Sequence, residues 1–211
     1  MSEINISLLA ENKNLLEFEI TENFSCIRFI EKNKERFELE FNLEKGTCFN
    51  TFLIRNNEEL FIIHPPEKQY FNSFNKVISK FCDQFKLNKI NLISGHINPK
   101  IIETIKNIST QFQKTTITCS NPGYKLISEL WNQRNPTLEN FIEIQLPKLN
   151  IIKKELNLEL DNISLELIPI PTARWPGGLI IYERNQEILL SEKIFSAHIA
   201  VSYTHLRAHE T

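Results

Sequence analysis

Glycine is scarce in this sequence of 211 residues. Only five glycines occur, whereas ordinary usage would place roughly fifteen in a chain of this length. Because glycine is valued for backbone conformations and close approaches that other residues resist, we expect each of the five to lie where the backbone needs it.

Long apolar runs, a leader segment and an excess of charge are also lacking. No stretch approaches the roughly 20 apolar residues that a bilayer span requires. The start, MSEIN, does not have the basic and then apolar layout of a secretory signal. The formal net charge is -2, which gives no nucleic-acid footprint. We therefore expect a cytoplasmic protein with no membrane insertion and no nucleic-acid partner.

Cysteine is sparse and carries no motif. Cys26, Cys48, Cys82 and Cys119 are scattered along the chain without C-x-x-C spacing, so neither a disulfide framework nor a zinc knuckle is indicated. In an intracellular chain such residues behave as small buried apolar side chains. Cys119 also has no His or Asp arranged with it in sequence, which argues against a nucleophile.

The apolar pattern predicts an α/β chain. Alternating or continuous apolar runs predict strands, and apolar residues at three- and four-residue spacing predict helices. Expected strands are 16–21, 37–41, 47–54, 60–63, 89–94, 115–119, 141–146, 156–160, 164–168, 179–182 and 188–191, and expected helices are 71–85, 98–108 and 120–131. The middle of the chain alternates strand and helix, which implies parallel strands. Ligands gather at the carboxyl ends of such strands, here near 95–100 and 120–121.

Six short motifs occur in an order and spacing that resemble a known family. They are residues 46–55 (GTCFNTFLIR), 64–67 (HPPE), 95–100 (GHINPK), 119–123 (CSNPG), 168–178 (IPIPTARWPGG) and 190–198 (LSEKIFSAH). Each motif alone is weak, but together they are specific. The chain resembles the N-terminal domain of cyanobacterial diflavin flavoproteins, a multidomain branch of the flavodiiron proteins.

The resemblance implies a metallo-β-lactamase-like αββα sandwich, incomplete at its C-terminus. Residues 1–200 would form this partial domain. Residues 201–211 look like a translated sequencing adapter and are excluded from the fold. In the family, such a domain carries a diiron site, and FMN lies in a following flavodoxin-like domain. The cyanobacterial branch takes electrons from NAD(P)H and passes them through flavin to oxygen.

The resemblance also implies where iron ligands should lie. The family motif H-x-E-x-D-H corresponds to residues 96–101, where only His96 matches, while Asn98 and Lys100 stand in place of two acids. Arg174 replaces the histidine before the Trp-Pro pair, and Lys193 replaces the bridging aspartate. His198 also falls in a family motif, which leaves both loop packing and a place on the electron route open for it.

Protonated lysine and arginine have no lone pair for a metal, and two irons need carboxylates and several imidazoles. We therefore expect no standard diiron centre, and we assign no metal ligands in this chain, where only His96 matches a ligand position. Two interpretations of the site stay open. The cations Lys100, Arg174 and Lys193 could surround His96 and bind an anion or polarised small molecule, or they could be vestigial and pair with nearby acids.

Two functions from different classes follow. In the first, the chain is a fragment of an NAD(P)H:oxygen oxidoreductase that works with another flavodiiron-type subunit. In the second, it is a non-catalytic module that pairs subunits. We expect the fragment to be inactive alone and to bind no cofactor, with FMN and NAD(P)H belonging to the full-length protein. A hydrolase is not supported, because H-x-H-x-D-H is absent.

Overall fold

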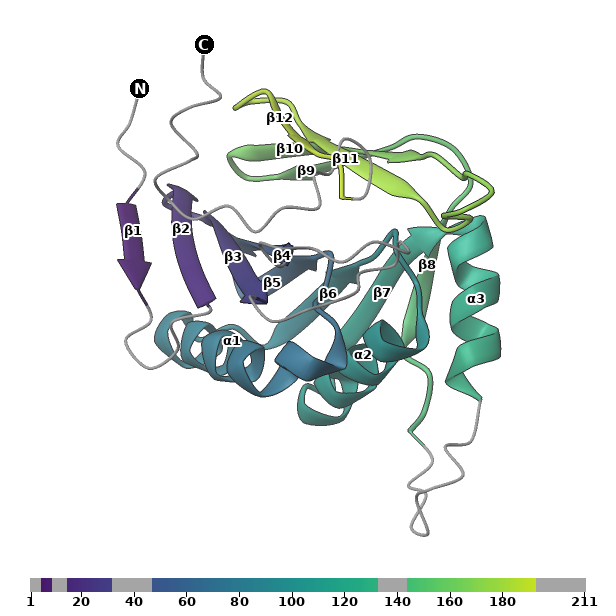
Figure 1. The fold of residues 1–211 in the computed structure, drawn as a ribbon. Helices are drawn as coiled ribbons and strands as arrows, with labels where there is room; N and C mark the ends of the chain where they lie inside the picture. Colours follow the sequence, from purple (N-terminus) through teal and green to yellow (C-terminus); the bar gives the residue numbers. More distant parts are fainter. Residues whose placement is uncertain (1–4, 9–14, 32–46, 133–143, 193–211) are drawn as a thin grey trace, which may run out of the picture.

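Two β-sheets packed face to face form the centre of the fold (Figure 1). The computed structural model describes residues 5–8, 15–31, 47–132 and 144–192. One sheet has eight strands in chain order, β1 to β8, and the other has four in the order β12-β11-β10-β9. The predicted metallo-β-lactamase-like arrangement is confirmed in these two layers.

The eight-stranded sheet begins antiparallel and ends parallel. Strands β1 to β5 pair antiparallel, and β5 to β8 pair parallel. Their bounds are β1 (Asn5–Leu8), β2 (Leu15–Thr21), β3 (Phe24–Glu31), β4 (Thr47–Asn56), β5 (Glu59–Ile63), β6 (Lys89–Ile93), β7 (Thr115–Ser120) and β8 (Lys148–Ile152). The change to parallel pairing follows from the helical crossovers, because parallel neighbours need a long connection.

The remaining elements complete the layers. The second sheet contains β9 (Leu156–Leu160), β10 (Ile163–Pro169), β11 (Leu179–Glu183) and β12 (Ile188–Leu190). A short 3-10 helix η1 (Lys68–Tyr70) leads into α1 (Phe71–Phe85), and α2 (Pro99–Gln111) and α3 (Asn121–Trp131) follow. In Figure 1, α1 and α2 lie below the eight-stranded sheet and α3 stands beside β8. Within the described residues no helix lies over the four-stranded sheet, so the fourth layer of an αββα sandwich is not part of them.

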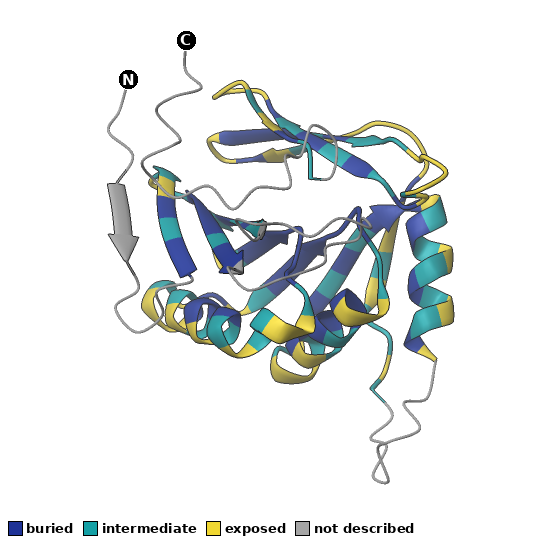
Figure 2. Ribbon diagram, viewed as in Figure 1, coloured by how far each residue is buried: buried dark blue, intermediate teal, exposed yellow. Residues whose placement is uncertain are grey.

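Two apolar cores hold the layers together (Figure 2). One lies between the eight-stranded sheet and the helices, with Phe74, Ile90 and Ile105 fully buried. The other lies between the two sheets and includes Ile63 and Leu165. Burial of such side chains is the main favourable term in folding. None of the helices in the described part of the chain is long and apolar enough to span a bilayer.

Three parts of the sequence-based strand assignment need correction. The strands β1 and β3 were not predicted, although β3 pairs with neighbours on both sides. The strand expected at 141–146 is wrong at 144–146, where the chain is irregular, and β8 begins instead at Lys148. Ile144 and Leu146 pack against the helix-side core, and the Ile144 carbonyl accepts the indole N–H of Trp131 at 2.8 Å. The apolar residues of 144–146 therefore serve packing against the core, and this segment does not pair with a strand. Residues 37–41 and 141–143 lie outside the described part.

Candidate functional site

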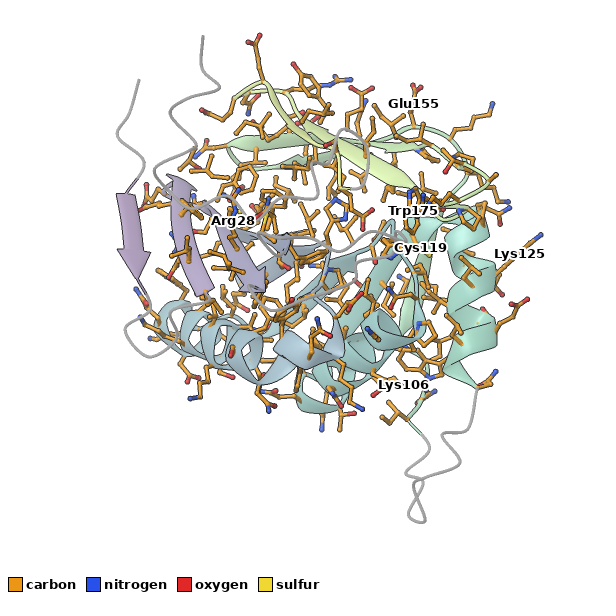
Figure 3. The ribbon with its side chains drawn as sticks, viewed as in Figure 1. Arg28, Lys106, Cys119, Lys125, Glu155 and Trp175 are labelled. Carbon is orange, nitrogen blue, oxygen red and sulfur yellow. The ribbon has the colours of Figure 1, made fainter. Side chains whose placement is uncertain are left out.

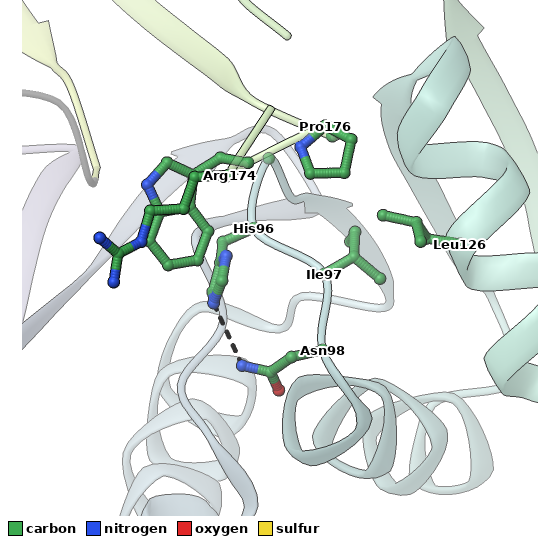
Figure 4. Close-up of a pocket in the computed structure, with 9 residues that line it drawn as sticks. His96, Ile97, Asn98, Leu126, Arg174 and Pro176 are labelled. Carbon is green, nitrogen blue, oxygen red and sulfur yellow. Dashed lines mark hydrogen bonds between the residues drawn. The ribbon is translucent and has the colours of Figure 1, made fainter. Parts of the chain in front are cut away.

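A pocket of about 370 Å³ opens where the sequence placed the site, at the carboxyl end of β6 (Figure 4). Three segments that are distant in sequence enclose it: the loop after β6, helix α3 and the loop between β10 and β11. The lining residues are Gly95, His96, Ile97, Asn98, Leu126, Arg174, Trp175, Pro176 and Gly177. The pocket thus combines apolar walls with one imidazole, one amide and one guanidinium.

The loop between β10 and β11 is held by its own hydrogen bonds and by α3. The Trp175 carbonyl accepts from the backbone N–H of Thr172 at 3.1 Å and of Gly178 at 3.0 Å. The Thr172 hydroxyl accepts from the Trp175 N–H at 3.0 Å. Ser120, the N-cap of α3, donates its hydroxyl proton to the Gly177 carbonyl at 2.9 Å. The helix expected over 120–131 thus begins at Asn121, with Ser120 as its cap.

Close backbone contacts explain why glycine is retained at this site. A Cβ on Gly177 would lie 2.8 Å from the carbonyl oxygen of Gly95 and 3.3 Å from Cα of Gly123. A Cβ on Gly95 would lie 2.7 Å from the backbone nitrogen of Leu179. Three glycines from three predicted motifs therefore let the loops meet. This confirms the expectation for them, while Gly46 lies outside the described residues.

His96 is buried against Trp175. The residue is 7% exposed, and its ring meets the indole edge to face, with centroids 4.6 Å apart and planes at 82°. Its backbone N–H donates to Oε1 of Glu192 at 3.1 Å. Trp175 is therefore a half-buried wall of the pocket that packs against the imidazole.

Asn98 connects His96 to the start of α2. It is the N-cap of that helix, and its Oδ1 accepts from the Ile101 N–H at 2.9 Å. Its Nδ2 lies 3.2 Å from Nε2 of His96 and 3.4 Å from Oε1 of Glu67. Asn98 is thus both the N-cap of α2 and a residue that lines the pocket.

The predicted cluster of cations is only partly assembled. Arg174 lines the pocket, is exposed, and holds its guanidinium 5.3 Å from the centre of the Trp175 ring. Lys100 does not line the pocket, because its Nζ turns to Oε2 of Glu67 at 3.5 Å and its side chain is 57% exposed. Lys193 and His198 lie outside the described residues. For Lys100, the pairing with a nearby acid is the interpretation that holds.

Two buried ionisable residues beside the pocket were missed in the sequence. Glu192, whose side chain is 8% exposed, has its Oε1 3.7 Å from Nδ1 of His64. His64, from the motif at 64–67, adopts a left-handed conformation, with φ 56°. Its carbonyl accepts the Thr51 hydroxyl at 2.8 Å. Glu192 directly precedes Lys193 in the motif 190–198. The signal that the sequence offered for Glu192 was a charged residue next to the end of a predicted strand.

Three of the four cysteines are buried. Burial raises the pKa of Cys119 to about 12, and it does the same for Cys26, to about 12, and for Cys82, to about 11. Cys119 lies inside the fold, whereas Lys125 and Glu155 point outward (Figure 3). The thiolate is the reactive form of cysteine, so the prediction that Cys119 is no nucleophile is supported.

The donors at the site do not fit a pair of irons. Within the described ranges, no three His, Cys, Asp or Glu side chains are grouped so as to hold a metal ion. The pocket offers a single imidazole, beside an amide whose oxygen already caps α2 and a guanidinium that has no lone pair for a metal. Iron sites of this type need several carboxylates and imidazoles.

The two-sheet sandwich, with its site after β6, defines a metallo-β-lactamase-like domain. The family described as "ODP family beta lactamase" matches residues 48–210, and the chain belongs to this family. It is similar to diflavin flavoprotein A 6 of Nostoc sp., with 34% identity over 178 residues, which is 84% of this chain and 29% of that protein. Diflavin flavoprotein A 5 of the same organism is 30% identical over 85% of this chain and 29% of its own length.

Solved structures give the same relationship. The metal-soaked Flv1 flavodiiron core from Synechocystis sp. matches with a TM-score of 0.75 and 25% identity, over 90% of this chain and 44% of that one. A fragment, 1–254, of diflavin flavoprotein A 5 from Nostoc sp. matches with a TM-score of 0.73 and 26% identity, over 91% and 71%. The chain spans only about three tenths of the length of these curated relatives, so the similarity concerns one part of those proteins.

Proposed function

We propose that this chain is the metallo-β-lactamase-like part of a longer diflavin oxidoreductase. In that protein, electrons would pass from NAD(P)H through flavin to oxygen. Residues 1–200 would be the partial domain, and residues 201–211 a foreign tail. The similarity to diflavin flavoproteins over most of the chain is the observation that carries the proposal.

The site in this chain would not hold the family's diiron centre. The amide of Asn98 and the guanidinium of Arg174 stand where the resemblance calls for metal ligands, and His96 alone retains a ligand-type side chain. A subunit without the metal site needs an acceptor elsewhere. We therefore propose that the intact protein works with another flavodiiron-type subunit in the cytoplasm, and that this fragment is inactive alone.

The experiment uses the complete reading frame that contains this chain, expressed alone and together with a metal-containing flavodiiron subunit. We expect bound flavin, little iron in the single protein, and NAD(P)H-dependent oxygen uptake that increases when the subunits are combined. Two irons per chain would overturn the claim about the metal site. A reading frame without flavin-binding segments would overturn the proposal as a whole.

The non-catalytic pairing module makes a different prediction for the same assay. Arg174 is exposed and lines the pocket, so Arg174→Ala changes the site with little effect on the core. A pocket that takes part in oxygen uptake predicts a lower rate in the assembled complex. A module that only pairs subunits predicts an unchanged rate per complex, with any loss confined to assembly measured by size-exclusion chromatography.

A further inference from the structure

The imidazole of His96 would have to offer its Nε2 lone pair to bind a metal on the side of Asn98. That lone pair is already in use. The cap on α2 fixes the amide of Asn98, because Oδ1 accepts from the Ile101 N–H at 2.9 Å and Nδ2 must then face the ring at 3.2 Å. An amide nitrogen donates hydrogen bonds and accepts none. Nε2 therefore accepts, and the neutral ring carries its proton on Nδ1.

We propose that Asn98 excludes metal ions from the His96 site. Its NH₂ group lies 3.2 Å from Nε2 of His96 and 3.4 Å from Oε1 of Glu67. It thus occupies the point where an imidazole nitrogen and a carboxylate oxygen converge, which is where a cation would sit. The exposed ammonium of Lys100 lies 3.5 Å from the other carboxylate oxygen of Glu67.

Asn98 therefore determines specificity against metal ions: it supplies no metal ligand, and its amide also blocks the place of the ion. The NH₂ hydrogens of the amide occupy the place between His96 and Glu67 that a cation would otherwise take. The helix cap prevents the amide from rotating away from this place. The inference rests on the proposed function only in taking this pocket as the family's metal site. It does not depend on flavin, NAD(P)H or oxygen.

The structure suggests a minimal reversal. In Asn98→Asp, one carboxylate oxygen can still accept the Ile101 N–H, because aspartate is as good an N-cap as asparagine. The other oxygen then replaces Nδ2 beside Nε2 of His96 and Oε1 of Glu67. One imidazole and two carboxylates form a set that divalent transition metals bind.

The test is the binding of Co²⁺ to the chain. It is measured by equilibrium dialysis and by the visible absorption of the bound ion. We expect Asn98→Asp to bind Co²⁺ at least about 10- to 100-fold more tightly than the unchanged chain, the range by which groups around a metal change its affinity. Asn98→Ser is the matched control, because serine caps the helix but adds no carboxylate. It should remain within about threefold of the unchanged chain, a margin well below that range. Adding His96→Ala to Asn98→Asp should abolish the gain.

The proposal is overturned if the unchanged chain binds Co²⁺ as tightly as Asn98→Asp, or if folded Asn98→Asp binds no more tightly. Imidazole ¹⁵N chemical shifts of the unchanged chain give a second test that needs no variant. We expect the tautomer protonated on Nδ1, and a neutral ring protonated on Nε2 would contradict the proposal. Both measurements use this chain without flavin, so a failure of NAD(P)H-dependent oxygen uptake in the longer protein would leave them unaffected.

Discussion

The hydroxyl of Ser120 donates a hydrogen bond to the carbonyl oxygen of Gly177 at 2.9 Å, across 57 residues of sequence. The Ser120 Oγ also accepts the N–H of Gly123 at 3.2 Å, as the cap of α3. One fully buried side chain therefore joins the end of β7, the start of α3 and the pocket loop. The bond thus anchors one end of the loop that carries Arg174 and Trp175.

Ser120→Ala should lower the free energy of unfolding by about 1–3 kcal/mol, because it removes a helix cap and leaves the Gly177 carbonyl without this buried partner. Urea denaturation measures the change. Ser109→Ala is the control, since that hydroxyl bonds only the Ile105 carbonyl of its own helix at 2.8 Å. A loss no larger at Ser120 than at Ser109 would contradict the linking role.

Gly177→Ala should be destabilising by about 1–3 kcal/mol, the usual cost of forcing an extra carbon into a packed site. The added Cβ would meet backbone atoms of Gly95 and Gly123, which cannot rotate away. Gly123→Ala is the comparison, because its contacts are looser, at 3.2 Å or more, and alanine favours a helix. Thermal or urea unfolding should therefore rank Gly177→Ala as clearly the more harmful, and equal effects would argue against the close approach.

Glu183→Gln should lower stability by roughly 2–3 kcal/mol, since hydrogen bonds to a charged group are the stronger ones and an amide offers only one acceptor. The carboxylate is fully buried and accepts backbone N–H groups of Ser164 at 3.1 Å, Asn185 at 3.1 Å and Gln186 at 2.6 Å. It thereby holds the turn between β11 and β12. Glu155→Gln, at an exposed position, should change the urea midpoint little, and equal losses in the two variants would refute the role.

Stability should decrease at alkaline pH partly because of Cys119. Burial raises its pKa from 9.0 to about 12 in the folded chain. Between these values the unfolded chain releases the thiol proton and the folded chain keeps it, so unfolding is favoured as pH rises. One such group contributes at most about 1.4 kcal/mol per pH unit. Urea unfolding from pH 8 to 10.5 should show a shallower decline in Cys119→Ala, and parallel curves would contradict the assignment.

Part of the site could be read from the sequence and part could not. The Asn-Pro pair at 98–99 predicted a helix start, and the parallel strands predicted that His96 and Asn98 lie at a strand end. Glu67 and Glu192 could not be connected to them, because both hydrogen-bond partners come from other segments of the chain. The orientation of the Lys100 side chain could not be predicted either, because its partner Glu67 is 33 residues away in the sequence.

The sequence by itself determined the α/β class and the helix starts, and it indicated that the few glycines lie where the backbone needs them. Local spacing, capping and backbone freedom are properties of short segments, so they can be read from the sequence. The motifs also determined which family the chain resembles. Only the tertiary structure decided that Gly95, Gly123 and Gly177 meet at one contact. It also decided that Nδ2 of Asn98 lies 3.2 Å from Nε2 of His96. Such relationships depend on distances between segments far apart in the chain, which the packing of the two sheets and their helices sets.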